Sequence, residues 1–253
     1  LQNIQRDVRH YFLPDNEGWY ILEIDLKQAE DKVVKVLSQN AEAITIARDN
    51  NRDVHTEAAA RMFRTPEGSV TKDQRYTGKR TRHARNYGMG PKRLQQILLN
   101  DGYVKSLGEC ENLLTRAGEA EPWVETWHEM TRRMLWRKKS LCNSWGRQIS
   151  FEGERVADHE IIKRSYAFIP QSEVGDLLNQ YGVIETDKYL LSKEIGLQVK
   201  INLQEHDALV LSVPREELYV VASRIVANLT LPRNYRVRAT SLDTMDGGVE
   251  LSI

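Results

Sequence analysis

The sequence predicts an α+β fold, with a small sheet built from segments near both ends of the chain and a long helical insertion between them. Near the start, residues 19–25 form an apolar, β-rich run. Near the end, residues 197–213 form two apolar runs separated by a tight turn. Helical spacing of apolar side chains dominates the residues between these segments. Strands from distant parts of the chain must therefore pair to complete the sheet.

The composition is that of an ordinary soluble globular protein. The 253 residues are 40% apolar and 28% charged, and they suffice for one large domain or two modest ones. No apolar run approaches the roughly 20 residues that span a bilayer, and the first residues lack the apolar core of a secretory signal. We therefore expect no membrane partner, and we expect Cys110 and Cys142 to be free thiols in a reducing compartment.

Charge is balanced overall but clustered locally. Lys plus Arg and Asp plus Glu each total 36, so the net charge is zero and does not indicate a nucleic-acid binder. Residues 75–93 are strongly basic and contain no acid, and a second basic cluster covers residues 132–139. Such clusters can bind phosphates through charge and counterion release. A solvated helix face is the alternative, with equal weight for the second cluster.

The first half of the chain predicts one strand followed by helices. Residues 19–25 predict a buried strand that ends in the carboxylate of Asp25. Helical spacing then predicts helices over residues 28–37, 53–63, 72–86, 91–99 and 122–139. The last of these carries an apolar stripe, for which core packing is the default explanation. The stripe consists of Trp123, Trp127, Met130, Met134 and Leu135.

The last third of the chain returns to the sheet. The sequence predicts a helical region over residues 168–191, opened by Pro170, followed by a hairpin. The hairpin consists of a strand over 197–204, a tight turn at His206–Asp207 and a strand over 208–213 ended by Pro214. An amphipathic helix over 216–229, a strand over 235–241 and a turn at Gly247–Gly248 follow. The hairpin places a second strand-associated carboxylate, Asp207, at its tip.

Asp25 and Asp207 are the first candidates for chemistry. Carboxylates on neighbouring strands can converge, and a divalent metal supplies the counter-charge that such carboxylates need. Phosphoryl transfer by two metals requires a platform of this kind, and Mg²⁺ binds few carboxylates together with water and substrate phosphates. Two unrelated surface aspartates are the alternative interpretation.

A second set of candidates lies at four-residue intervals on the predicted helix over residues 72–86. Arg75, Lys79, His83 and Tyr87 form one slowly drifting stripe, because four residues advance about 400° around a helix. Two cations with two flat rings suit a nucleoside triphosphate, since cations bind phosphates and rings contact the base and sugar. An exposed basic helix is the alternative, with equal weight.

Several segments together resemble family A DNA polymerases, the family of bacterial DNA polymerase I. The resembling segments are Leu1–Ile4 (family LQNIP), Asp25–Glu30 (motif A, DYSQIE), Arg52–Thr56 (DIHT), Arg75–Gly88 (motif B, R-x3-K-x3-F-x3-YG) and Gln204–Ala208 (motif C, QVHDE). They occur in family order and at family-like distances. Each motif alone is a weak signal, but the set is highly specific.

The resemblance implies the palm and fingers of a right-handed polymerase. Residues 1–31 and 165–253 would form the palm, an antiparallel sheet with helices, and residues 32–164 would form an inserted, mostly helical fingers subdomain. The motif B helix would cover about 72–88 and the motif C hairpin about 197–213. The chain opens within a family motif, so we expect a fragment of a longer protein, with the thumb and any 3′–5′ exonuclease upstream.

The resemblance also implies an activity, its cofactors and its partners. The protein would be a template-directed DNA polymerase that adds deoxynucleotides to a primer 3′-OH by two-metal nucleotidyl transfer and releases pyrophosphate. Two Mg²⁺ ions would be the cofactors, with Mn²⁺ as a substitute. Primer–template DNA and dNTPs would be the partners. An upstream thumb or exonuclease segment, or a processivity partner, is a further candidate.

Residue roles follow from the matched positions. Asp25 and Asp207 would bind the metals, Glu30 would crowd a ribose 2′-hydroxyl, and Gln28 would help hold Glu30. On the triphosphate, Arg75, Lys79 and His55 would bind phosphates, and Lys79 is a candidate general acid for the departing pyrophosphate. His83 would lie over the base and sugar, and Tyr87 would lie beside the templating base. The DNA-binding residues would be Gln171, Gln204, His206 and, by a looser alignment, Arg147.

Four departures from the family pattern point to a divergent lineage, viral or organellar. They are His83 for an aromatic residue, Ala208 for the Glu after the motif C aspartate, Lys27 with Asp31–Lys32 in motif A, and Ala167 for an Asn. None removes a residue that the chemistry strictly needs. We expect an intracellular protein, in the cytoplasm or a host cytoplasm, with an organelle as an alternative.

Three other functions compete with this interpretation. A single-subunit phage-type RNA polymerase shares the two aspartates and the motif B helix, but a gate at Glu30 would be pointless there. A non-catalytic primer–template-binding remnant would explain the altered motif C, although Asp25, Asp207, Lys79 and Arg75 all remain. A generic basic helical module is the last alternative.

Overall fold

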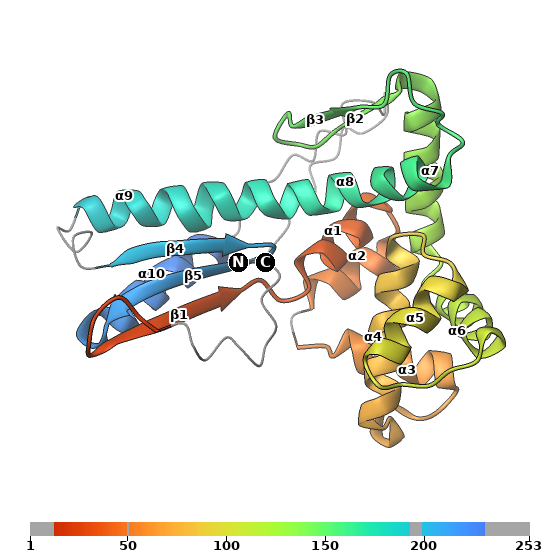
Figure 1. The fold of residues 1–253 in the computed structure, drawn as a ribbon, viewed down its shortest axis with the longest axis horizontal. Coiled ribbons are helices and arrows are strands. Elements are labelled where there is room, and N and C mark those ends of the chain that lie inside the picture. The colour runs from red at the N-terminus through yellow and green to blue at the C-terminus, as the bar shows by residue number, and fades with distance from the viewer. Residues whose placement is uncertain (1–12, 50, 193–198, 231–253) are drawn as a thin grey trace. The chain divides into compact units, whose positions relative to one another are not determined.

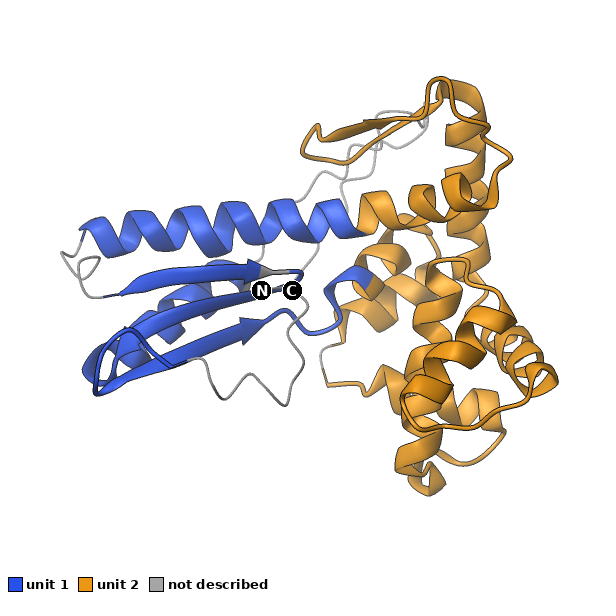
Figure 2. Ribbon diagram, viewed as in Figure 1, with its two compact units in different colours: residues 1–30, 171–236, 247–253 blue, residues 31–170, 237–246 orange. Residues whose placement is uncertain are grey.

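The computed structural model describes residues 13–49, 51–192 and 199–230 and confirms the predicted α+β class (Figure 1). The chain divides into two compact units (Figure 2). Unit 1 contains residues 1–30, 171–236 and 247–253, and unit 2 contains residues 31–170 and 237–246. The predicted strand over 235–241, the Gly247–Gly248 turn and the Leu1–Ile4 motif lie outside the described residues.

Unit 1 is built on a three-stranded antiparallel sheet. The strands are β1 (Trp19–Asp25), β4 (Lys200–Glu205) and β5 (Ala208–Pro214), in the order β1-β5-β4. The central strand β5 is buried along almost its whole length, because it has a neighbour on each side. Helix α10 (Leu218–Thr230), which follows the short η5 turn (Arg215–Glu217), packs against this sheet. The predicted pairing of distant segments is confirmed, but the prediction that residues 19–25 form a buried strand is wrong, because no residue of β1 is buried.

A long helical run enters unit 1 after Pro170. It consists of α8 (His159–Leu177), the π-helical segment η3 (Leu178–Ile184) and α9 (Glu185–Ser192). The prediction that Pro170 opens this helix is wrong, because α8 begins at His159 and Pro170 lies inside it. A proline in a helix interior costs about 3 kcal/mol. Pro170 and its neighbour Ile169 are both buried in the structure.

Unit 2 is helical, as predicted. Its helices are α1 (Ala29–Leu37, which begins in unit 1), α2 (Ala41–Arg48), α3 (Val54–Phe63), the short η2 (Glu67–Ser69), α4 (Lys72–Asn86), α5 (Pro91–Asn100), α6 (Leu107–Ala120) and α7 (Trp123–Lys138). A small hairpin of β2 (Ser140–Cys142) and β3 (Gln148–Ser150) follows α7. This hairpin was not predicted, because strands of three residues give too short a pattern to recognise.

Helix α4 is fixed at both ends and closely packed in its middle. Thr71 and Gln74 form a capping box, with Gln74 N donating to Thr71 Oγ1 at 3.2 Å and Thr71 N to Gln74 Oε1 at 2.9 Å. A Cβ at Gly78 would lie 3.0 Å from Ala59 Cβ, so glycine lets α3 and α4 approach. Gly88 adopts φ 64° just beyond the helix, the left-handed conformation that favours glycine.

The core of unit 2 is lined by the predicted α7 stripe. Four of the five stripe residues, Trp123, Trp127, Met134 and Leu135, are buried and Met130 is half-buried, so core packing accounts for the stripe. A separate cluster joins α4, α5 and α6 through Ala84, Leu94, Leu98 and Cys110. Cys110 and Cys142 are both free thiols.

None of the helices in the described ranges is long and apolar enough to cross a membrane.

Candidate active site

In unit 1, backbone pairing brings the two predicted metal-binding aspartates to the same end of the sheet. Asp25 is the last residue of β1 and pairs with Ala208, the first residue of β5. The next residue, Leu26, donates its N–H to the carbonyl oxygen of Asp207 at 2.9 Å. Asp25 is exposed and Asp207 is half-buried. The register of the sheet therefore places the two carboxylates on adjoining stretches of backbone.

The turn that carries Asp207 and the start of α1 bring a third carboxylate into this region. His206 takes φ 52° in the two-residue turn between β4 and β5. The pKa of Glu30 is raised to about 7, chiefly by burial and also by the negative charge of Asp207, against the opposing charge of His206. Because Glu30 responds to Asp207, the predicted sugar gate lies in the same electrostatic environment as the predicted metal ligand. Gln28, with φ 59°, is half-buried just before α1.

The donor chemistry at this end of the sheet fits magnesium. Within the described ranges, no group of three or more His, Cys, Asp or Glu side chains is arranged to hold a metal alone. Mg²⁺ does not need one, because it is commonly bound through one or two carboxylates, with water and substrate phosphates as the other ligands. Ala208 stands where the family has Glu and is only 5% exposed in the central strand.

The residues predicted to contact DNA in unit 1 lie on β4, its turn and α8. Gln204 Nε2 donates to the carbonyl oxygen of Gly175 at 3.2 Å, so the strand is tied to the helix. Gln171 is exposed one turn before Gly175, and His206 is exposed at the hairpin tip. These three side chains remain candidates for nucleic-acid contact.

In unit 2, α4 presents the predicted stripe on one face. Arg75, Lys79 and His83 are exposed, whereas Tyr87 is buried at the end of the helix. The rings of His83 and Tyr87 pack edge to face, with centroids 4.7 Å apart. Desolvation by neighbouring atoms lowers the pKa of His83, and the charges of Arg80 and Lys79 lower it further. His83 therefore favours its neutral form.

The two exposed cations of the stripe differ in their pairing. Arg75 forms a fork with Asp53, from Nε to Oδ2 at 2.9 Å and from Nη2 to Oδ1 at 3.1 Å. The hydrogen bond from Arg75 is the main reason that the pKa of Asp53 lies well below its usual range. Lys79 forms no ion pair with any residue that the structure describes. An anion at this face would therefore meet Lys79 directly but would compete with Asp53 for Arg75.

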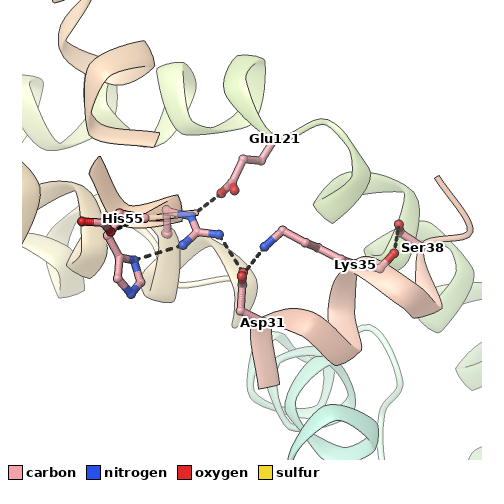
Figure 3. Close-up of polar contacts among 7 residues, drawn as sticks. Asp31, Lys35, Ser38, His55 and Glu121 are labelled. Atoms are coloured by element: carbon pink, nitrogen blue, oxygen red, sulfur yellow. Dashed lines mark hydrogen bonds and ion pairs between the residues drawn. The ribbon is translucent and has the colours of Figure 1, made fainter. Parts of the chain in front are cut away.

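Behind this face lies a buried charge network that the sequence did not predict (Figure 3). Arg82 is 3% exposed and makes three side-chain contacts. Nε donates to Glu121 Oε2 at 2.7 Å, Nη2 to Asp31 Oδ1 at 2.8 Å, and Nη1 lies 3.1 Å from His55 Nδ1. Lys35 also pairs with Asp31. Asp31, which is a departure from the family motif, is thus one partner of a buried arginine.

The network controls the protonation of its members. Burial would raise the pKa of Asp31, but the charges and hydrogen bonds of Arg82 and Lys35 outweigh burial and lower it. The pKa of His55 is lowered to about 4, chiefly by burial and then by the charges of Arg82, Lys79 and Arg75, against the opposing charge of Asp31. Asp31 is therefore ionised and His55 is neutral at neutral pH.

The second basic cluster is only partly available to a ligand. Arg132 donates to Tyr166 Oη at 2.6 Å and to Glu125 Oε1 at 2.9 Å, so it is engaged within unit 2. Arg133 is 77% exposed, although it lies 3.6 Å from Glu129. Arg147, the loosely aligned DNA-binding candidate, is exposed in the turn between β2 and β3. The cluster thus combines an internal structural arginine with solvated cations.

Comparison with known proteins places this fold. The POL domain of Pol1 from M. smegmatis, solved in complex with DNA primer-template and dNTP, matches with a TM-score of 0.76 at 21% identity, over 91% of this chain and 41% of that one. The fold is therefore that of a polymerase domain. The family model for DNA polymerase family A matches residues 1–240, and the chain belongs to that family. The resemblance predicted from the motifs is confirmed.

Bacterial DNA polymerases I are among the relatives. The thermostable DNA polymerase I of Thermus aquaticus is 28% identical over 232 residues, which cover 88% of this chain and 26% of that protein. The DNA polymerase I of Bacillus caldotenax is 27% identical over 236 residues, which cover 86% of this chain and 25% of that protein. The chain thus spans about a quarter of the length of these relatives.

Proposed function

We propose that this chain forms the palm and fingers of a DNA-directed DNA polymerase, which extends a primer 3′-OH with deoxynucleotides and releases pyrophosphate. The observation that carries the proposal is the pairing of Asp25 with Ala208, beside Asp207, in a chain of DNA polymerase family A. The division of the chain supports the proposal, because the two compact units separate after Glu30 and after Pro170, close to the palm–fingers boundaries predicted at residues 31/32 and 164/165. Unit 1 would be the palm and unit 2 the fingers.

In the palm, Asp25 and Asp207 would hold two Mg²⁺ ions, with Mn²⁺ as a substitute. Bound ions would activate the primer hydroxyl and stabilise the charge on the phosphates. Glu30 would exclude ribonucleotides by crowding the 2′-hydroxyl, and Gln28 would support it. Primer–template DNA would contact Gln171, Gln204 and His206.

In the fingers, Lys79 would contact the triphosphate, since it is exposed and has no ion-pair partner in the described part of the chain. Its ammonium group can neutralise growing negative charge and donate a proton to the departing pyrophosphate. Arg75 would join it by exchanging Asp53 for a phosphate. His55 would contact the phosphates, His83 would lie over the base and sugar of the incoming nucleotide, and Tyr87 would lie beside the templating base. Arg147 would contact the DNA.

Primer extension tests the proposal. The chain is incubated with a labelled primer–template, Mg²⁺ and either dNTPs or rNTPs. Template-dependent extension with dNTPs is expected. Extension that strongly prefers rNTPs would instead support the RNA polymerase alternative. Binding of primer–template without any extension would support the non-catalytic remnant, and absence of both would leave only a generic basic module.

A further inference from the structure

We propose that Arg82 is a positioning residue that fixes His55 as the neutral Nε2–H tautomer, so that His55 offers a hydrogen-bond donor to a phosphate oxygen of the nucleotide. This role deepens the proposed function and rests on it. Arg82 itself is buried and does not contact the nucleotide. Neither Arg82 nor the tautomer of His55 is implied by the family motifs, which name no residue at position 82.

The direction of the contact between the two side chains follows from their chemistry. A guanidinium group has donors and no acceptor, and it stays protonated in proteins. The 3.1 Å contact from Arg82 Nη1 therefore requires His55 Nδ1 to accept. An imidazole whose Nδ1 accepts carries its proton on Nε2 when it is neutral. Figure 3 shows the second ring nitrogen of His55 directed away from this contact.

Arg82 is held firmly enough to impose this geometry. Glu121 and Asp31 bind two of its nitrogens at 2.7 and 2.8 Å, which leaves Nη1 for His55. The two carboxylates compensate the desolvation of a side chain that is only 3% exposed. Lys35 shares Asp31, so the network is charge-balanced with two cations and two anions. Lysine could not replace arginine, because one ammonium cannot reach three partners in a planar fork.

The surroundings keep His55 neutral and suit an anion. His55 lies in the first turn of α3, where Asp53 caps the helix. The charged groups that influence its ring are Arg82, Asp31, Lys79 and Arg75. Burial lowers the pKa of His55 to about 4, so the ring gains no second proton near neutral pH. Nε2–H is then its one remaining donor, and the cations on α4 favour a phosphate as the acceptor.

Loss of Arg82 would free the ring to adopt either tautomer. In the Nδ1–H form, the Nε2 lone pair would point at a phosphate oxygen and repel it. We therefore expect weaker nucleotide binding and a smaller effect on chemistry. A hydrogen bond to a charged oxygen corresponds to about a tenfold change in nucleotide KM.

The test compares two charge-balanced double variants on the same helix. Arg82→Met with Glu121→Gln removes the donor and one carboxylate together, and it leaves Asp31 paired with Lys35. Arg80→Met with Asp101→Asn is the matched control, because it removes an exposed α4 ion pair of 2.9 Å. Side-chain ¹⁵N NMR reports the tautomer of His55, with signals assigned through His55→Gln. Thermal unfolding checks that each variant folds.

The expected result is a pure Nε2–H tautomer of His55 in the unmodified chain at pH 7 and a mixture in the Arg82 variant. Nucleotide KM rises about tenfold and kcat falls less than threefold in that variant, while the control changes neither. An Nδ1–H or protonated His55 in the unmodified chain would overturn the proposal. So would a variant with pure Nε2–H and unchanged KM.

If the unmodified chain lacks polymerase activity, the proposed function fails, and the role of Arg82 toward nucleotide fails with it. The NMR comparison then still tests tautomer control. If the Arg82 variant does not fold, the unmodified chain alone remains a test, since an Nδ1–H or protonated His55 there would overturn the proposal.

Discussion

The candidate residues of the two units are positioned by different forces. In unit 1, backbone hydrogen bonds determine the positions, since Asp25 pairs with Ala208 and Leu26 N reaches Asp207 O. In unit 2, buried ion pairs position the candidate residues, since Arg82, held by Glu121, orients His55. Strand register tolerates changes in neighbouring side chains, whereas an ion-pair network depends on each member. Unit 1 can therefore vary around its aspartates more freely than unit 2 can vary around Arg82.

The largest expected effect is that of metal removal, which acts on unit 1. Excess EDTA should abolish primer extension, and Mg²⁺ or Mn²⁺ should restore it, because the metal ions would activate the primer hydroxyl and stabilise the charge on the phosphates. The unfolding temperature without DNA should stay nearly unchanged, since the described residues contain no group that holds a metal alone. Extension that persists in EDTA would contradict the metal assignment.

A smaller but still severe effect is expected for Lys79→Ala in unit 2. Lys79 would stabilise charge that grows in the transition state, so single-turnover incorporation should fall about 100-fold. Affinity for primer–template should change little. Lys72→Ala, which removes an exposed cation from the first turn of α4, is the control. A loss of DNA affinity with an intact single-turnover rate would indicate that Lys79 contacts the primer–template and not the triphosphate.

The selectivity of the sugar gate should respond more modestly. Glu30→Ala should raise kcat/KM for rNTPs relative to dNTPs by at least about tenfold, because a gate acts by exclusion and its removal favours the excluded substrate. Rapid-quench incorporation of one dNTP and the matching rNTP measures the ratio. An unchanged ratio would remove Glu30 from this role.

The smallest expected effect concerns stability against pH in unit 2. His55 has an ordinary pKa near 6.5 when unfolded and about 4 when folded, so the unfolded state binds more protons between these values. Stability from this group is therefore complete above pH 6.5 and is lost as pH falls toward 4. His55→Gln should reduce the difference in unfolding free energy between pH 7 and 4.5 by roughly 1–2 kcal/mol, allowing for partial solvent screening. Denaturant titrations at both pH values, compared with His159→Gln at an exposed site, measure this difference.

The sheet site was predictable because strands and hairpins leave local patterns. The run over residues 19–25 and the turn at His206–Asp207 each specify a strand end, and neighbouring strand ends bring their aspartates together. The α4 stripe was predictable for a similar reason, since four-residue spacing determines a helix face. The patterns alone left open two unrelated surface aspartates and an exposed basic helix, and the set of family motifs selected this interpretation.

The charge network was not predictable, because it depends on contacts between distant helices. Glu121, Arg82 and Asp31 come from three separate segments, and each alone resembles an exposed polar residue. The ion pair between Arg75 and Asp53 was not predictable for the same reason, since it joins two separate segments. The helix boundary predicted at Pro170 was wrong, because proline locally favours the start of a helix but here lies buried inside α8.

The most direct test of the central claim is single-turnover incorporation of one dNTP by Asp25→Asn and Asp207→Asn. Each substitution keeps the size of the side chain and removes the charge that would hold a metal. Glu23→Gln, on the same strand as Asp25, is the control. Each aspartate variant should lose at least about 1,000-fold in rate while it keeps its circular dichroism spectrum and its affinity for primer–template. A rate within tenfold of the unmodified chain in either variant would contradict the assignment of the sheet end as the catalytic centre.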